Sequence, residues 1–333
     1  MARTVGKGVT GAGTGLDEHG IFVLRHVFSR LVVLLAVLAA LCGLGVGGAF
    51  AADPQAAKPV TMADILAQSP ASDWRLLDPQ NTLYLDLDGP GGQSGRVVIE
   101  LAPGFAPRHV ETIRAIARAG AVSPAVTRVQ DNFVTQWRLT TAELPPLKAE
   151  FTRNAGVLFT ALPDRDTFAP EVGFMDGFPA ARDPQSGTAW LVHCYAMVAV
   201  GRENAADSGN GAELYTVIGQ APRQLDRNMT VVGRIVSGVE RLSALPRGTG
   251  AMGFYESPQT PITIRSVRLA ADLPANERQA LEALRTDSQT FAALVEARRN
   301  RRDAFYHVPA NAIDVCNVPL PVREHRPETA QVR

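Results

Sequence analysis

Residues 126–136 read Val-Thr-Arg-Val-Gln-Asp-Asn-Phe-Val-Thr-Gln, and this stretch, with Arg128 in it, is the most informative part of the chain. Its first four residues are β-branched apart from one arginine, which is typical of a half-buried strand. Successive side chains of a strand point to opposite faces, so we expect Thr127 and Val129 on one face and Arg128 on the other.

Two interpretations of Arg128 follow from the sequence. A lone arginine flanked by valines most often lies on the solvated side of an edge strand, and a nearby phenylalanine such as Phe133 is usually core. Alternatively, Arg128, Phe133 and Gln136 converge on one concave surface and form a site. The order of the neighbouring segments along the chain favours the second interpretation, in which these residues form a site.

The segments before this stretch predict a hairpin and a helix. Residues 81–87 and 95–101 alternate as half-buried strands. The glycine-rich residues 89–95 form the turn between them rather than a phosphate loop, since no helix begins there. Apolar residues recur at helical spacing over residues 110–117, and Gly120 supplies a stop signal.

Four further segments follow at residues 147–151, 195–200, 208–217 and 225–240. In this order, the segments from about residue 81 to 270 resemble the cyclophilin-type peptidyl-prolyl isomerases. The catalytic stretch of that family has the sequence Phe-His-Arg-Val, followed closely by Phe-Met-X-Gln. The resemblance implies a mainly β fold, a closed antiparallel β-barrel capped by helices.

The resemblance also implies a site. Its catalytic residue is Arg128, which donates a hydrogen bond toward the prolyl nitrogen while the amide twists. Arginine suits this role because its fork is rigid and always charged. The implied substrate-binding residues are Phe133, Val134, Gln136, Ala199, Glu213, Tyr215, Leu225 and Met229. Gln136 is expected to orient the substrate, and neither a metal nor an organic cofactor is implied.

Several residues depart from the family pattern, among them Gln224 in the place of a tryptophan. Trp137 fills a position that the family keeps small, so we expect it to narrow or reshape the groove. Glu213 replaces a glutamine and is expected to pair with Arg128 or to compete with substrate for it. Tyr215 replaces a phenylalanine and keeps an aromatic wall, while Met229 replaces a histidine and keeps the pocket apolar.

We therefore predict a peptidyl-prolyl cis-trans isomerase that accelerates X-Pro bond rotation in exported proteins and so assists protein folding. Its partners are expected to be proline-containing unfolded or loop polypeptides, and the chain to be a monomer. The alternative, motivated by Trp137, Glu213 and Met229, is a catalytically weak peptide-binding chaperone or scaffold of the cell envelope. A carbohydrate- or envelope-binding barrel is a third class, which rests only on location and the tail.

The charge balance is neutral. The 333 residues carry 33 basic and 33 acidic side chains, so no electrostatic argument favours nucleic acid or an anionic membrane as partner. With 23 prolines and 29 glycines, the composition suits a turn-rich β protein.

The amino terminus predicts export. Basic residues precede an apolar run at residues 31–46, and residues 49–51 read Ala-Phe-Ala, a small-X-small cleavage site. A spanning helix needs about 20 apolar residues, and this run is shorter. We expect cleavage after Ala51, rather than an inner-membrane anchor, and a periplasmic mature protein.

Cleavage would leave two cysteines, Cys194 and Cys316, in an oxidising compartment. The sequence leaves two possibilities open: a disulfide that staples the tail to the barrel, or two separate buried thiols. His109, His193 and the aspartates of residues 164–176 lack the spacing of metal ligands, so we expect them to be solvated or structurally bonded.

The flanking residues predict extensions of the barrel. We expect a capped helix at residues 61–66 and two further helices at 276–286 and 288–302. The insertion at residues 154–187 is expected to form a long loop beside the groove. The predicted division is 1–51 signal peptide, 52–80 N-terminal extension, 81–270 cyclophilin-like domain and 271–333 C-terminal helical tail.

Overall fold

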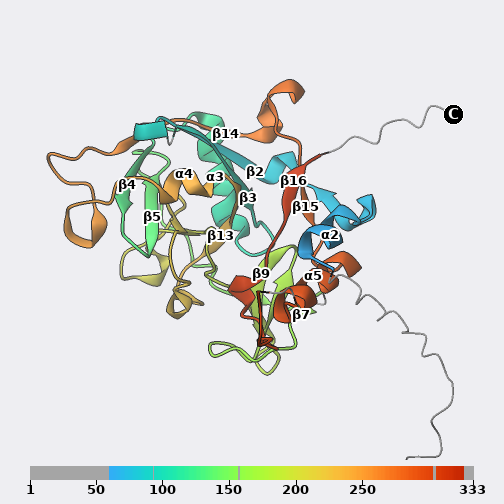
Figure 1. Cartoon of the computed structure of the whole chain (residues 1–333). Coiled ribbons are helices and arrows are strands. Elements are labelled where there is room, and N and C mark those ends of the chain that lie inside the picture. The colour runs from blue at the N-terminus through green and yellow to red at the C-terminus, as the bar shows by residue number, and fades with distance from the viewer. Residues whose placement is uncertain (1–59, 93, 157, 303–304, 326–333) are drawn as a thin grey trace, which may run out of the picture. The chain divides into compact units, whose positions relative to one another are not determined.

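Eight antiparallel strands close into a barrel in the order β11-β12-β5-β4-β14-β2-β3-β13. The computed structural model describes residues 60–325 except 93, 157, 303 and 304, so the predicted signal peptide lies outside the described residues (Figure 1). The barrel strands are β2 (Thr82–Leu87), β3 (Gly95–Leu101), β4 (Ala125–Val129), β5 (Val134–Arg138), β11 (Met197–Val200), β12 (Glu213–Val217), β13 (Val231–Ser237) and β14 (Ile262–Leu269). The predicted closed β-barrel is confirmed.

The predicted hairpin forms strands β2 and β3, and both of its faces are buried. Leu85 lies opposite Val97 and points into the barrel core. Tyr84 and Val98 point outward and join a second cluster with Ala283 of the C-terminal extension. The same outward face carries the buried carboxylates of Asp86 and Glu100, so the C-terminal extension covers a face that is partly apolar and partly charged.

Helix α3 (Pro107–Ala119) caps the barrel. Proline at the first helical position suits the fixed φ of a helix start, and the helix ends before Gly120, whose φ of +83° favours glycine. Val110 and Ile113 on its apolar face are fully buried in the barrel core. The helix predicted at residues 110–117 is confirmed and begins one turn earlier.

Strand β4 contains a β-bulge between Val126 and Arg128. Val126 and Val129 are three positions apart, yet both lie in the barrel core. The expectation that Thr127 shares the face of Val129 is therefore wrong, because the bulge adds one residue and breaks the two-residue period. Beyond the bulge, Arg128 lies opposite Gln136 on the neighbouring strand.

The insertion is a folded sheet, so the loop predicted at residues 154–187 is wrong. Its strands pair in the order β6-β10-β9-β8-β7. Their bounds are β6 (Arg153–Asn154), β7 (Thr160–Ala161), β8 (Glu171–Met175), β9 (Phe178–Asp183) and β10 (Thr188–Leu191). Asp176 and Gly177 both have positive φ, as a two-residue hairpin turn requires. This Asp-Gly pair was the sequence signal for the hairpin.

The C-terminal extension combines a strand and a helix. The helix predicted at residues 276–286 is wrong, because that segment forms β15 (Leu281–Leu284) between β1 (Trp74–Leu76) and β16 (Val322–Glu324). All four residues of β15 are buried, so tertiary pairing has overridden a helical apolar spacing. The second predicted helix is confirmed as α5 (Gln289–Arg299).

Helix α2 (Met62–Ala67) begins with the predicted cap. Thr61 and Asp64 exchange side-chain and backbone hydrogen bonds as a capping box. Helix α2 packs against α5, and Phe291 of α5 meets Phe174 of β8 edge to face at 4.9 Å between ring centroids. The two extensions and the insertion thus share one apolar cluster, as the neighbouring positions of β9, α2 and α5 suggest in Figure 1.

A disulfide joins Cys194 to Cys316, which decides between the two possibilities that the sequence left open. Cys194 follows β10, and Cys316 lies in the short helix η9 (Val315–Asn317) of the tail.

No helix within the described residues is both long and apolar enough to cross a membrane.

The disulfide closes a loop with a sequence separation of 122, so its removal should destabilise the fold. We expect Cys194→Ser/Cys316→Ser to lower the free energy of unfolding by about 2–5 kcal/mol, because an open chain has more unfolded-state entropy. Denaturant unfolding measures this loss. Thiol titration of the unreduced, denatured chain from residue 52 onward should find no free thiol, and two free thiols would contradict the structure.

Candidate active site

A cavity of about 160 Å³ opens beside Arg128. Its walls come from strands β4, β5 and β12, from the residues that follow β11 and from the segment that leads into β13. The lining residues are Arg128, Phe133, Val134, Gln136, Gly201, Arg202, Tyr215, Leu225 and Met229. The structure therefore brings Arg128 together with six of the eight predicted substrate-binding residues.

Antiparallel register places the central residues of the cavity in one row. On β5, Gln136 lies opposite Arg128 of β4 on one side and opposite Tyr215 of β12 on the other. Directly opposed residues on one face of a sheet have neighbouring side chains. Strand β5 therefore joins the cationic end of the cavity to its aromatic wall.

The guanidinium of Arg128 is held by neutral groups. Its Nε donates to the carbonyl of Met252 at 2.7 Å, one terminal nitrogen donates to Gln136 Oε1 at 3.3 Å, and the other donates to Gln130 Oε1. The group also lies over the ring of Phe254, 5.2 Å from its centroid. Burial lowers the pKa of Arg128. A cation held by dipoles rather than by a carboxylate keeps its charge available to a ligand.

Glu213 reaches Arg128 only through Gln136. The amide nitrogen Nε2 of Gln136 donates to Glu213 Oε2 at 3.3 Å, while Oε1 of the same amide accepts from Arg128. The expected direct pairing of Glu213 with Arg128 is therefore wrong, because the amide of Gln136 lies between them. This bridge fixes which end of the Gln136 amide faces the arginine.

Ala199 and Glu213 do not line the cavity. Ala199 is fully buried and lies opposite Tyr215 in the β11–β12 pair. Gly201 and Arg202 line the cavity instead, and we did not predict them. Gly201 follows Ala199 at the two-residue period of a strand, which was the signal available in the sequence.

Trp137 lies in the barrel core with none of its surface exposed. The expectation that it narrows the groove is wrong. Gln136 faces the cavity, and the next side chain on a strand must point to the opposite face. The barrel interior, rather than the groove, accommodates the large residue.

The remaining polar candidates are structurally bonded. His109 contacts Glu150 at 2.7 Å, and His193 contacts Asp226 at 3.0 Å. Asp164, Asp166 and Asp176 pair with Arg299, Arg223 and Arg153, respectively. Among the residues that the structure describes, no group of three or more histidine, cysteine or acidic side chains could hold a metal ion.

A larger cavity of about 490 Å³ lies between the insertion and the tail. Both of its arginines are already paired, Arg75 with Glu100 at 2.6 Å and Arg285 with Asp287 at 3.0 Å. The smaller cavity combines an arginine without a carboxylate partner among the described residues, an oriented amide and apolar walls. We therefore take the smaller cavity as the candidate active site.

The family is established by comparison with known proteins. A family model described as cyclophilin type peptidyl-prolyl cis-trans isomerase/CLD matches residues 85–269, which is more than half of the chain. The chain belongs to this family of isomerases, as the sequence predicted. No curated protein matches the chain.

A solved structure shows the same fold. The crystal structure of cyclophilin AquaCyp293 from Hirschia baltica is 24% identical, with a TM-score of 0.61, and covers 80% of this chain and 99% of that chain. Two crystal structures of a Cryptosporidium parvum cyclophilin type isomerase are 10% and 12% identical, each with a TM-score of 0.38. They cover 56% and 57% of this chain and 98% and 96% of theirs, and one was determined in the presence of the dipeptide Ala-Pro.

Burial raises the pKa of Glu213 above its ordinary value of 4.5, although the Gln136 amide and the charge of Arg138 act in the opposite direction. The folded chain then binds the proton more tightly than the unfolded chain does. Glu213 therefore lowers the free energy of unfolding as pH rises from 4.5 through the raised pKa.

We expect Glu213→Gln to become progressively more stable relative to the wild type as pH rises from 4.5 through the raised pKa of Glu213, because an amide has no charge to desolvate. Denaturant unfolding across that range measures the difference. Exposed Glu203→Gln serves as the control. An unchanged difference between Glu213→Gln and wild type across the range would rule the effect out.

Proposed function

We propose that the cavity beside Arg128 catalyses rotation about X-Pro bonds in exported polypeptides. The observation that supports this best is the position of Arg128, which holds its charge at one end of a small cavity with apolar and aromatic walls. The substrate class is unfolded or loop segments that contain proline. No cofactor takes part in the proposed mechanism.

Catalysis of X-Pro bond rotation requires stabilisation of the twisted amide. Rotation about a peptide bond has a barrier of about 18–20 kcal/mol, because the nitrogen lone pair is shared with the carbonyl. As the bond twists, the lone pair localises on the prolyl nitrogen and becomes a hydrogen-bond acceptor. A donor that meets it only in that state lowers the barrier without any covalent bond.

Arg128 is suited to be that donor. A guanidinium has five N–H groups, and three of them are used by Met252, Gln130 and Gln136 within the described residues. Two remain for the substrate. Since three bonds already fix the plane of the fork, little reorganisation is needed when the twisted amide forms.

The other walls hold the proline ring and the substrate backbone. Phe133, Leu225 and Met229 supply apolar surface that contacts the ring in the planar and the twisted states alike. Gln136 uses one N–H for Glu213 and has a second that can donate to a substrate carbonyl. The apolar residues thus contribute to the binding of the substrate, and Arg128 lowers the barrier to rotation.

Arg128→Ala should lower kcat by about 10²–10³-fold, the typical loss of one transition-state hydrogen-bond donor. Arg128→Lys should not restore the rate, because a lysine lacks the planar fork. NMR exchange or a protease-coupled assay on an X-Pro peptide measures both. Arg265→Ala removes an arginine whose side chain is 61% exposed on β14 and should leave kcat unchanged.

The same assay separates the isomerase from a catalytically weak peptide-binding scaffold. Glu213 and Met229 still motivate that alternative, whereas Trp137 does not, because it lies in the core. Peptide binding by the wild type without measurable exchange would favour the scaffold. Full activity of Arg128→Ala would remove Arg128 from the mechanism.

We also propose that the chain is exported to the periplasm. The apolar run at residues 31–46 with its Ala-Phe-Ala site supports export, and so does the Cys194–Cys316 disulfide, since disulfides persist in oxidising compartments.

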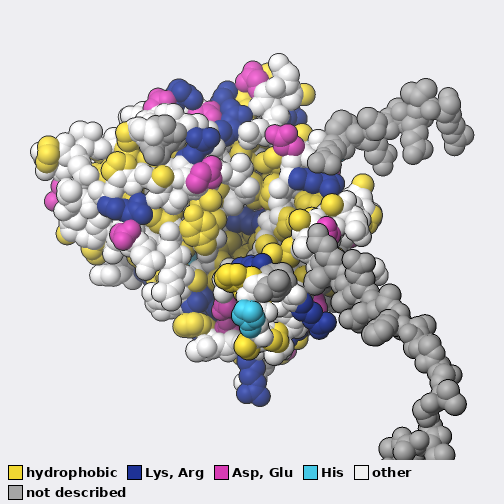
Figure 2. All heavy atoms as spheres, viewed as in Figure 1, with side chains coloured by type: hydrophobic (Ala, Val, Ile, Leu, Met, Phe, Trp, Pro, Cys, Tyr) yellow, Lys and Arg dark blue, Asp and Glu magenta, His cyan; other side chains and the backbone are white. Residues whose placement is uncertain are grey.

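In Figure 2, basic and acidic side chains are interspersed over the visible face, which fits a protein without a strongly charged partner.

Export predicts a mature chain that begins at Ala52 in the periplasmic fraction of a host with two membranes. Small residues at the cleavage site fit the signal peptidase. Replacing them, as in Ala49→Arg/Ala51→Arg, should leave the precursor uncleaved. Fractionation and N-terminal sequencing measure the outcome, and an unprocessed wild-type chain in the cytoplasm would refute the proposal.

A further inference from the structure

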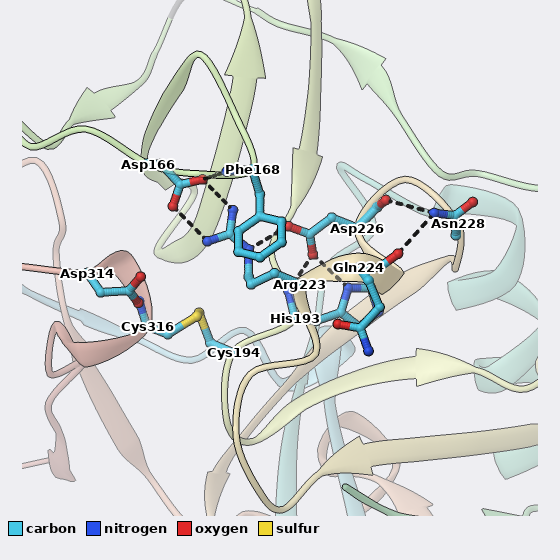
Figure 3. A network of polar contacts seen from close by, with 10 residues as sticks. All are labelled: Asp166, Phe168, His193, Cys194, Arg223, Gln224, Asp226, Asn228, Asp314 and Cys316. Carbon is cyan, nitrogen blue, oxygen red and sulfur yellow. Dashed lines mark hydrogen bonds and ion pairs between the residues drawn. A yellow bond between two sulfur atoms is a disulfide. The ribbon is translucent and has the colours of Figure 1, made fainter. Parts of the chain in front are cut away.

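A chain of buried polar contacts leads from the candidate active site into the insertion. The hydroxyl of Tyr215 contacts His193 Nε2 at 3.1 Å, and His193 Nδ1 contacts Asp226 Oδ1 at 3.0 Å. Arg223 Nε donates to the other oxygen of Asp226 at 2.7 Å. The fork of Arg223 then donates to both oxygens of Asp166 at 2.8 and 2.9 Å, as Figure 3 shows.

These groups are almost completely withdrawn from solvent. His193 is fully buried, Arg223 is 5% exposed and Asp226 is 7% exposed, while the side chain of Asp166 is 4% exposed. Burying charges in this way is costly unless each has a well-placed partner. Loss of one partner should therefore rearrange the others rather than leave them in place.

The contacts of Asp226 define which nitrogen of His193 donates to it. Asp226 Oδ1 accepts the backbone N–H of His193 as well as contacting Nδ1. A carboxylate can only accept, so Nδ1 carries a proton and donates it. His193 Nε2 lies 3.1 Å from the hydroxyl of Tyr215, so the imidazole links that hydroxyl to Asp226. Asp226 thus positions the imidazole that contacts the Tyr215 hydroxyl.

The chain of contacts holds two walls of the cavity. Tyr215 lines the cavity from β12, and Leu225 lines it from the short helix η5 (Arg223–Leu225), which begins with the buried arginine. Asp166 lies in the insertion, between β7 and β8. The ion pair between Asp166 and Arg223 therefore ties the insertion to the turn that presents Leu225.

We propose that Asp166, Arg223, Asp226 and His193 are positioning residues through which the insertion sets the fit of the proline pocket. The inference rests on the proposed function, because it assigns the proline ring to the walls that Tyr215 and Leu225 form. None of the four positioning residues lines the cavity. They act on the substrate through Tyr215 and Leu225.

The insertion contains a matched control. Asp164 pairs with Arg299 of α5 through both of its oxygens at 2.7 and 2.8 Å, and its side chain is 13% exposed. Asp164 also accepts the backbone N–H of Ile313. Asp164 and Asp166 thus hold similar ion pairs two residues apart, but Asp164 leads to the tail and Asp166 leads to the pocket.

The test compares Asp166→Asn with Asp164→Asn in the full mature chain. Both variants should lose stability in denaturant unfolding, because each weakens an ion pair that is largely withdrawn from solvent. Only Asp166→Asn should raise KM, by about tenfold, which is what a small misfit in an apolar pocket costs. Its kcat should stay within about a factor of two of wild type, since the ring is bound in the planar and the twisted states alike.

A double-mutant cycle tests the route. Tyr215→Phe keeps the aromatic wall and removes only the hydroxyl, so it disconnects Tyr215 from His193. We expect the effect of Asp166→Asn on KM to be smaller in the Tyr215→Phe background than in the wild type. Equal effects in both backgrounds would show that Asp166 does not act through the tyrosine.

NMR of the substrate-free protein gives a readout that does not depend on activity. The methyl resonances of Leu225 and the ring resonances of Tyr215 should shift in Asp166→Asn and stay in place in Asp164→Asn. If the two variants have the same KM and the same resonances, the inference is overturned while the isomerase remains. If the wild type has no isomerase activity, the proposed function fails, and the resonances alone decide whether the network positions the pocket.

Discussion

The pairing of β5 with β4 on one side and β12 on the other is the constraint on which the site depends. Its register places Gln136 between Arg128 and Tyr215, so one amide side chain separates the cation from the aromatic wall. The same register sends Trp137 into the barrel, where it is fully buried. A shift of one residue would exchange these two faces, placing the tryptophan in the cavity and the glutamine in the core.

The elements outside the barrel protect surfaces that the barrel alone leaves apolar or charged. The outward faces of β2 and β3 carry Tyr84 and Val98, which are buried only because the C-terminal extension covers them. The insertion sheet and α5 meet in an apolar cluster that also includes Tyr215. The candidate active site is therefore supported from behind by residues that lie far from it in the sequence.

Much of this architecture could be predicted from local patterns. The two strands at residues 81–101, the helix before Gly120 and the order of the later segments identified the barrel and its family, and they placed Arg128 beside six of its predicted neighbours. The predictions failed where distant residues decide the outcome. Residues 281–284 have a helical spacing but form a strand because β1 and β16 pair with it, and the insertion became a sheet through a hairpin at Asp176 and Gly177.

By itself, the sequence determined which residues alternate and which recur at helical spacing, and with them the family and the chemistry that an arginine, a glutamine and apolar walls can perform. Only the tertiary structure decided that Gln136 separates Glu213 from Arg128, that Cys194 meets Cys316 and that Asp166 is tied to the pocket through Arg223. The physical reason is that local pattern depends on neighbours a few residues apart, whereas these contacts depend on strand register and on burial. Both are set by segments that meet only when the whole chain folds.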